Sequence, residues 1–292
     1  MKVAEQEMLE ALNRSGYILE SEIAKQLSDW DFFVQSGPVV KDPITGKGRE
    51  IDIIAERYGA NNSNRDLKTH TNIEYVFEIK NNSFPIVLLN KFQFSPNIEP
   101  RFGLKEAISL PNGIDYRDDI FFEQLIENNK NIFTQYCSFH KKKGSHELMA
   151  SHPEKFHDSI SKIIQHCDEQ VEHYDQYIFN ENSEEVEADD YFRHRIYLPI
   201  LLVNDDLLEM SEDGLKKVDS STLVVNYYHK GEPYMAYIFI ITKHGLKDFI
   251  NRTQNLTENV LHEMNESRGK HLSEHDIQLH VEHPFKRAIK TD

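Results

Sequence analysis

Residues 48–57 read Gly-Arg-Glu-Ile-Asp-Ile-Ile-Ala-Glu-Arg, and residues 73–82 read Ile-Glu-Tyr-Val-Phe-Glu-Ile-Lys-Asn-Asn. Apolar and polar residues alternate through much of both runs, which is the period-two pattern of a β-strand. The residues between the two runs, 58–72, are rich in Asn, Ser and Asp and are typical of turns and loops. This stretch therefore predicts a β-hairpin.

An antiparallel hairpin would bring three charged side chains together. The start of its first strand lies beside the end of its second, so Asp52 is expected close to Glu78 and Lys80. Because side chains alternate, Glu78 and Lys80 point to one face of the sheet and Ile79 to the other. Carboxylates are preferred ligands of Mg²⁺, and a lysine beside that ion can help to cleave a phosphodiester. The alternative is a surface ion pair on a solvated sheet face.

Two helices and a short strand are predicted before the hairpin. Apolar residues recur at helical spacing over residues 8–27, and Gly16 is expected to break this region into two helices. The second helix begins at about Tyr17 and carries Glu20 and Glu22. The segment that follows has Gly and Pro turns between apolar pairs and is expected to contain a short strand. A helix, a strand and a hairpin form a compact α/β unit.

The order of these elements resembles the PD-(D/E)XK nucleases, a superfamily with the restriction-endonuclease-like fold. The resemblance covers about residues 16–82 and rests on three segments. They are the helix 16–27 with its glutamate, the strand Arg-Glu-Ile-Asp-Ile-Ile-Ala at 49–55 and the strand end Phe-Glu-Ile-Lys at 77–80. One departure is Ile51, which precedes the aspartate where the founding motif has a proline. Many members of the superfamily lack that proline.

The resemblance implies a role for each polar side chain of the hairpin. Asp52 and Glu78 would bind Mg²⁺ together with the backbone carbonyl of Ile79, and Mn²⁺ is an alternative metal. Lys80 would act on the attacking water or on the transition state. Glu20, on the preceding helix, would assist the metal site. The catalytic residues that the resemblance implies are therefore Glu20, Asp52, Glu78 and Lys80.

Two assignments around this site stay open at the level of sequence. Glu22 competes with Glu20 for the role of the helix carboxylate, although Glu20 matches the superfamily pattern better because it precedes an Ile-Ala pair by three residues. Substrate contacts are expected from basic residues that flank the hairpin, since lysine and arginine neutralise phosphates. Those candidates are Lys41, Lys47, Arg49 and Lys91.

Composition limits how the chain could bind nucleic acid. Its 292 residues carry a formal net charge of −16, which argues against a global basic field but leaves room for a local basic groove.

The first residues are too charged for a signal peptide, and no apolar run is long enough to span a membrane. Two cysteines, Cys137 and Cys167, fit a reducing compartment. A cytoplasmic protein without membrane contact is expected. A homodimer and a protein partner are both compatible with the sequence.

The second half of the sequence predicts further helices and strands. Apolar spacing indicates helices over about 117–136 and 153–179, and an acidic connector follows, so a largely helical insertion is expected at about 112–190. Near-continuous apolar runs then indicate strands covered on both faces, followed by a helix. The strands are expected at 195–203, 222–228 and 234–242, and the helix at about 243–263.

Together these patterns predict an α/β fold, a restriction-endonuclease-like mixed central sheet flanked by helices. A single domain is expected over residues 1–264, with a peripheral C-terminal tail over 265–292. The expected function is a metal-dependent nuclease that hydrolyses nucleic-acid phosphodiester bonds, with DNA as the first candidate substrate. The alternative is a non-catalytic module on the same fold that binds nucleic acid or a protein. The intact set of Asp52, Glu78 and Lys80 favours the enzyme.

Overall fold

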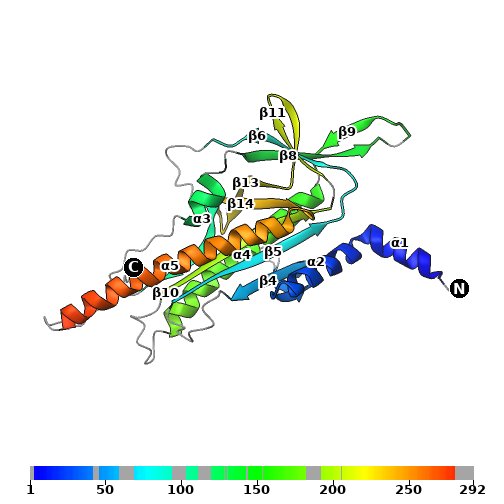
Figure 1. The fold of residues 1–292 in the computed structure, drawn as a ribbon. Helices are drawn as coiled ribbons and strands as arrows, with labels where there is room; N and C mark the ends of the chain where they lie inside the picture. Colours follow the sequence, from blue (N-terminus) through cyan, green and yellow to red (C-terminus); the bar gives the residue numbers. More distant parts are fainter. Residues whose placement is uncertain are drawn as a thin grey trace.

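The computed structural model contains a large mixed β-sheet with helices packed on both faces (Figure 1). This arrangement confirms the predicted α/β architecture with a mixed sheet flanked by helices. The structure describes residues 3–41, 46–58, 69–93, 103–110, 120–127, 129, 131–142, 144–152, 154–181, 192–204 and 206–279.

The main sheet comprises 12 strands in the described part of the chain. Ten of them follow one another across the sheet in the order β1 (Phe33–Ser36), β4 (Ile53–Tyr58), β5 (Thr69–Lys80), β10 (Phe192–Val203), β14 (Glu232–Thr242), β13 (Ser220–His229), β8 (Ile132–Lys141), β6 (Ile86–Lys91), β11 (Leu207–Ser211) and β12 (Gly214–Val218). To the side, β7 (Lys105–Ser109) pairs with β10, and β9 (Leu148–Ser151) pairs with β8. A separate small sheet is formed by β2 (Val39–Lys41) and β3 (Gly48–Glu50).

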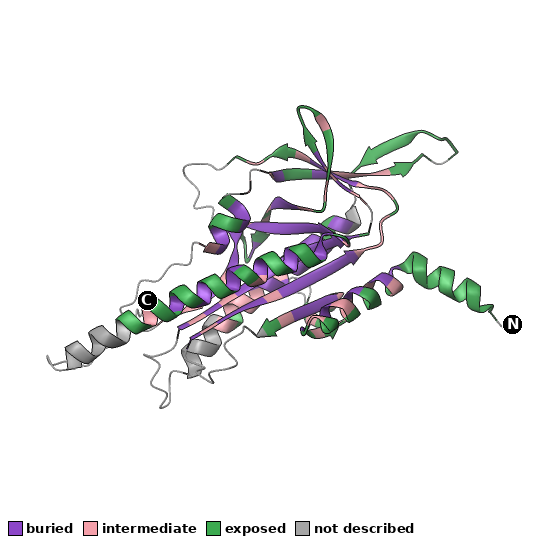
Figure 2. Cartoon of the chain, viewed as in Figure 1, coloured by how far each residue is buried: buried purple, intermediate pink, exposed green. Residues whose placement is uncertain are grey.

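The helices are distributed along the whole chain. In chain order they are α1 (Glu5–Ser15), α2 (Tyr17–Asp29), α3 (Ile120–Phe122) with a π-helical turn at Glu123–Glu127, α4 (Glu154–Glu181) and α5 (Leu246–Leu279). Gly16 separates α1 from α2 as predicted, and its φ of 95° is a left-handed conformation that glycine adopts without steric cost. Helix α1 has no buried residue, and Figure 2 shows it as exposed along its length.

The predicted hairpin is confirmed. Strands β4 and β5 pair antiparallel, with Ile53 opposite Phe77 and Ile54 opposite Val76. On its other side β5 pairs in parallel with β10 over the full length of both strands, so that Lys80 lies opposite Val203. The hairpin therefore lies inside the sheet near one edge, because β1 flanks β4 and β10 flanks β5.

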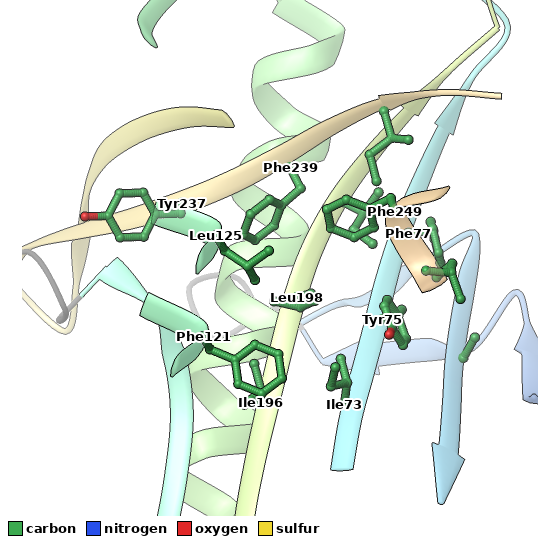
Figure 3. Packing of buried hydrophobic residues seen from close by; sticks show 14 of the residues in the cluster. Ile73, Tyr75, Phe77, Phe121, Leu125, Ile196, Leu198, Tyr237, Phe239 and Phe249 are labelled. Atoms are coloured by element: carbon green, nitrogen blue, oxygen red, sulfur yellow. The ribbon is translucent and has the colours of Figure 1, made fainter. Parts of the chain in front are cut away.

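Side-chain alternation divides the core into layers on opposite faces of the sheet. Ile53, Tyr75 and Phe77 pack in one cluster with apolar residues of α2 and α5. Their neighbours Ile54 and Val76 pack in another cluster with residues of α4. Figure 3 shows how the first cluster gathers aromatic side chains of β5, β14 and α5, including Tyr75, Phe77, Phe239 and Phe249. The part of the sheet around β5 is thus a buried layer between α2 and α5 on one face and α4 on the other.

The predicted insertion at about 112–190 requires correction. Helix α4 confirms the helix expected at 153–179, but the helix expected at 117–136 is wrong over Ile132–Tyr136, which belong to β8. The spacing of the apolar residues of β8 fits both the helical and the extended period. Pairing with β6 and β13 makes the segment a strand. Helix α4 also lies in the crossover between the parallel strands β5 and β10, where a helix normally belongs, and so forms a layer of the core.

The final elements follow the predicted order. Strands β10, β13 and β14 confirm the three apolar runs, and β13 pairs antiparallel with β14 as expected. The last helix is longer than predicted, since α5 continues to Leu279, and the expected boundary at residue 265 falls inside it. None of the helices described here combines the length and the apolar character that a membrane crossing requires.

Candidate active site

The start of β4 and the end of β5 bring the predicted carboxylates together. Asp52 immediately precedes β4 and, by the register of the hairpin, lies level with Glu78. One oxygen of Asp52, Oδ2, accepts a hydrogen bond of 2.6 Å from the backbone N–H of Ile79. The carbonyl of Asp52 accepts a second bond of 3.0 Å from the N–H of Gly37. These two bonds fix Asp52 at the end of the hairpin.

Glu78 is almost fully buried, with 1% of its side chain exposed. Its Oε2 lies 3.0 Å from Nζ of Lys80, whose own side chain is 23% exposed. The alternative of a solvated surface ion pair is therefore wrong for the carboxylate. A charge removed from water must be compensated by partners, because its desolvation is otherwise very costly.

Much of that compensation comes from Lys162 on α4, a residue that the sequence analysis did not select. The ammonium of Lys162 forms an ion pair with Oε1 of Glu78 and donates a hydrogen bond to the carbonyl of Glu50. Its side chain is largely buried. One signal was present in the sequence, since Lys162 stands between Ile160 and Ile163 of the apolar stripe that predicted α4. A lysine beside such a stripe lies at the edge of the buried face.

Burial and neighbouring charges both act on the carboxyl of Asp52. Burial raises the pKa of Asp52, and the neighbouring charge of Glu78 raises it further. The Ile79 N–H, Lys80 and Lys162 lower that pKa in part. A carboxyl whose ionisation is disfavoured by a neighbouring carboxylate marks a place where a cation would be stabilised.

The two candidate helix carboxylates have different surroundings. The pKa of Glu20 is raised, first by burial and then by the charge of Asp52, so Glu20 lies within electrostatic reach of the cluster. Glu22 instead forms an ion pair with Lys243, at 2.5 Å. Of the two, Glu20 is therefore the one whose charge couples to Asp52.

Three asparagines hold the end of β5 in place. The N–H of Asn204, just after β10, donates to the carbonyl of Lys80 at 3.0 Å and to Oδ1 of Asn82 at 2.9 Å. The side-chain amide of Asn204 donates to Oδ1 of Asn81 at 3.0 Å. These bonds continue the β5–β10 pairing beyond the last strand residue and restrict the backbone that carries Lys80.

The four basic residues proposed as substrate contacts do not lie together. Lys41 ends β2, Lys47 lies just before β3, and Arg49 lies within β3. These three residues therefore belong to one small hairpin. That hairpin continues directly into Asp52, and Lys162 binds its last residue, Glu50. Lys91 ends β6, which four strands separate from β5 across the sheet. The structure does not place Lys91 beside the carboxylates.

The donor set fits a hard divalent cation. Magnesium sites use one or two carboxylates, with water and substrate supplying the other oxygens. Asp52 and Glu78 provide two carboxylates, and the carbonyl of Ile79 faces the same side as its N–H, which points to Asp52. Larger sets are absent, since in the described ranges no group of three or more His, Cys, Asp or Glu side chains is arranged to hold a metal ion. A cation here would compete with Lys80 and Lys162 for Glu78.

Comparison with known proteins gave no match, whether to family models, to curated proteins or to solved structures.

Proposed function

We propose that this chain is a Mg²⁺-dependent nuclease that hydrolyses phosphodiester bonds, with DNA as the first candidate substrate. The observation that supports the proposal is the convergence of Asp52, Glu78 and Lys80 at one end of the hairpin, with Lys80 Nζ 3.0 Å from Glu78. Carboxylates that can hold a metal next to an ammonium are the groups that this hydrolysis requires. The order of the same residues carries the resemblance to the PD-(D/E)XK nucleases.

Each residue of the site has a distinct role in this proposal. Asp52, Glu78 and the carbonyl of Ile79 would hold Mg²⁺ or Mn²⁺. When bound, the metal supplies a polarised phosphate oxygen and a more acidic water. Lys80 orients the attacking water or stabilises the charge that develops on the phosphate. Glu20, with its raised pKa, assists as a proton acceptor on the helix side of the site.

Substrate binding is assigned to the β2–β3 hairpin. Lys47 and Arg49 lie within a few residues of Asp52, and Lys41 pairs with Gly48 in the same hairpin, so a backbone phosphate that they contact would be close to the carboxylates. The formal charge of −16 disfavours binding through the general surface. Phosphate contacts of this kind orient a strand without reading its sequence.

A second candidate is a binding module without hydrolytic activity. The observation that favours it is the pairing of both Glu78 oxygens, one with Lys80 and the other with Lys162. This arrangement balances the buried carboxylate without a metal ion. In such a module the hairpin would still contact nucleic acid, but no bond would be cleaved.

Cleavage assays separate the two candidates. The purified chain is incubated with linear, circular and single-stranded DNA and with RNA, in Mg²⁺ or in EDTA. The nuclease proposal predicts cleavage in Mg²⁺ alone, and its loss in Asp52→Ala but not in the control Lys25→Ala, a lysine 75% exposed on α2. Cleavage that survives Asp52→Ala would reject the assigned site. Binding without cleavage of any substrate would establish the module instead.

A further inference from the structure

A second built site lies farther along α4, where that helix faces the β13–β14 hairpin. A cavity of about 700 Å³ opens there between β7, α4, β13 and β14. Its volume falls within the range of small-molecule sites, roughly 300–1,000 Å³. Leu104, Val171 and Met235 contribute apolar walls. The proposed nuclease mechanism makes no use of this cavity.

The floor of the cavity is a buried network of charged and polar groups. Nζ of Lys105 lies 2.8 Å from Oδ1 of Asp168 and donates to the hydroxyl of Tyr227 at 2.6 Å. That hydroxyl donates in turn to Oδ2 of Asp168 at 2.7 Å. Lys105 is only 6% exposed. A buried lysine and aspartate and a partly buried tyrosine that satisfy one another form a rigid polar surface.

The hydrogen-bonding capacity left over in this network consists mainly of acceptors. The three protons of the Lys105 ammonium point to Asp168, Tyr227 and, at 3.4 Å, the carbonyl of Met235. At the rim, Glu172 has one partner for each oxygen, His229 Nε2 at 2.9 Å and Nζ of Lys230 at 2.5 Å. Each carboxylate oxygen can accept more than one hydrogen bond, so Asp168 and Glu172 retain free lone pairs. A ligand that complements them carries N–H donors.

Aromatic rings form the outer wall. The ring of Tyr234 lies 6.0 Å from that of Tyr227 and 5.7 Å from that of His229, measured between centroids. Tyr234 is 44% exposed, so part of its ring is open to the cavity and to solvent. Exposed aromatic faces bind planar rings by stacking, whatever the detailed identity of the ring.

We propose that this cavity binds a planar heteroaromatic ring with an exocyclic amino group, the chemistry of adenine, cytosine or guanine. Stacking on Tyr234 holds the ring, and Asp168 and Glu172 accept from the amino group. The base could belong to a free nucleoside or to a strand. Asp168 follows Lys162 by six residues of the same helix, a rise of roughly 9 Å. A nucleic-acid strand with one base in the cavity could therefore run toward Glu78. Only this case, in which the base belongs to a strand, rests on the proposed nuclease function.

The decisive measurement is calorimetric titration of the full chain in EDTA, where no cleavage can occur. Adenosine and cytidine are expected to bind at least tenfold more tightly than uridine, which has no exocyclic amino group. Tyr234→Ala should lose at least tenfold in adenosine affinity, Tyr234→Phe should retain most of it, and Tyr17→Ala, a matched change at a tyrosine 63% exposed on α2, should have no effect. Unchanged melting temperatures would show that all three variants fold.

Two further titrations distinguish the sources of the base. If adenosine binds and a ten-residue oligo-dA binds no more tightly, the ligand is a free nucleoside. If oligo-dA binds more tightly than oligo-dT, the base belongs to a nucleic-acid strand. Equal affinity for adenosine, uridine and both oligonucleotides, or no binding of any of them, would overturn the proposal. Because these titrations contain no divalent metal, their outcome is independent of whether the Asp52 site cleaves.

Discussion

Lys162 on α4 and Glu78 on β5 form an ion pair between the helix that covers the sheet and the carboxylate at the end of the β4–β5 hairpin. Lys80 pairs with the other oxygen of Glu78. Two ammonium groups thus compensate the charge that a divalent cation would compensate in a metal-loaded site. Metal binding and the Lys162 contact are therefore expected to compete.

Replacement of Lys162 by Met tests that competition. We expect the variant to be less stable in EDTA, by ~2 kcal/mol, because Glu78 loses one of two charged partners in a buried setting. Added Mg²⁺ should raise its melting temperature more than that of the wild type, since the ion no longer displaces an ammonium. Thermal unfolding in EDTA and in Mg²⁺ measures both effects, and Lys25→Met is the exposed control. Equal Mg²⁺-dependent shifts in variant and wild type would contradict the competition.

The raised pKa of Asp52 predicts how stability depends on pH in the absence of metal. A carboxyl whose pKa is higher in the folded state than in the unfolded state binds a proton on folding. The free energy of unfolding therefore falls as the pH rises from the ordinary pKa of 3.8 through the raised pKa of the folded state. Asp52→Asn should remove that part of the decrease and be more stable than the wild type at neutral pH in EDTA, while it loses stabilisation by Mg²⁺. Chemical denaturation at several pH values measures this; a variant less stable than wild type at every pH would exclude the assignment.

Local patterns in the sequence were sufficient for the hairpin and for its charged residues. Strands β4 and β5 are neighbours in the chain, so alternation and a polar connector determine their pairing. The continuous apolar runs of β10, β13 and β14 likewise indicate strands, and β10 is buried on both faces over most of its length, whereas β13 and β14 are so over part of theirs. These features depend on contacts that are close in sequence or on composition alone.

Features formed by distant segments could not be predicted in this way. Ile132, Phe133 and Tyr136 fit a helical or an extended period, and only pairing with β6 and β13 makes their segment a strand. The contact of Lys162 with Glu78 joins α4 to β5, which β6 to β9 separate in the sequence. No local spacing encodes such a contact, since it depends on where the crossover helix lies over the sheet.

Lys80 is predicted to act in the chemical step, and its removal should not weaken Mg²⁺ binding, because the ion competes with Lys80 for Glu78. Lys80→Ala removes the ammonium beside Glu78, and we expect the cleavage rate to fall ~100- to 1,000-fold, as for the loss of one group that stabilises developing charge. Glu78 keeps its contact with Lys162, so the fold should remain intact. Single-turnover cleavage measures the rate, and calorimetric titration with Mg²⁺ measures metal binding. A variant that cleaves as fast as the Lys25→Ala control would remove Lys80 from the mechanism.

The β2–β3 hairpin makes a quantitative prediction for the salt dependence of binding. If Lys41 and Lys47 each contact one phosphate of duplex DNA, the double variant Lys41→Ala/Lys47→Ala should bind more weakly and reduce the slope of log K against log salt by about 2. Lys91→Ala is the matched control, because Lys91 ends a strand that lies away from the site in sheet order. Fluorescence anisotropy with labelled DNA in EDTA, at several salt concentrations, measures the slopes. An equal change of slope in Lys91→Ala would place the nucleic acid elsewhere on the protein and separate binding from the Asp52 site.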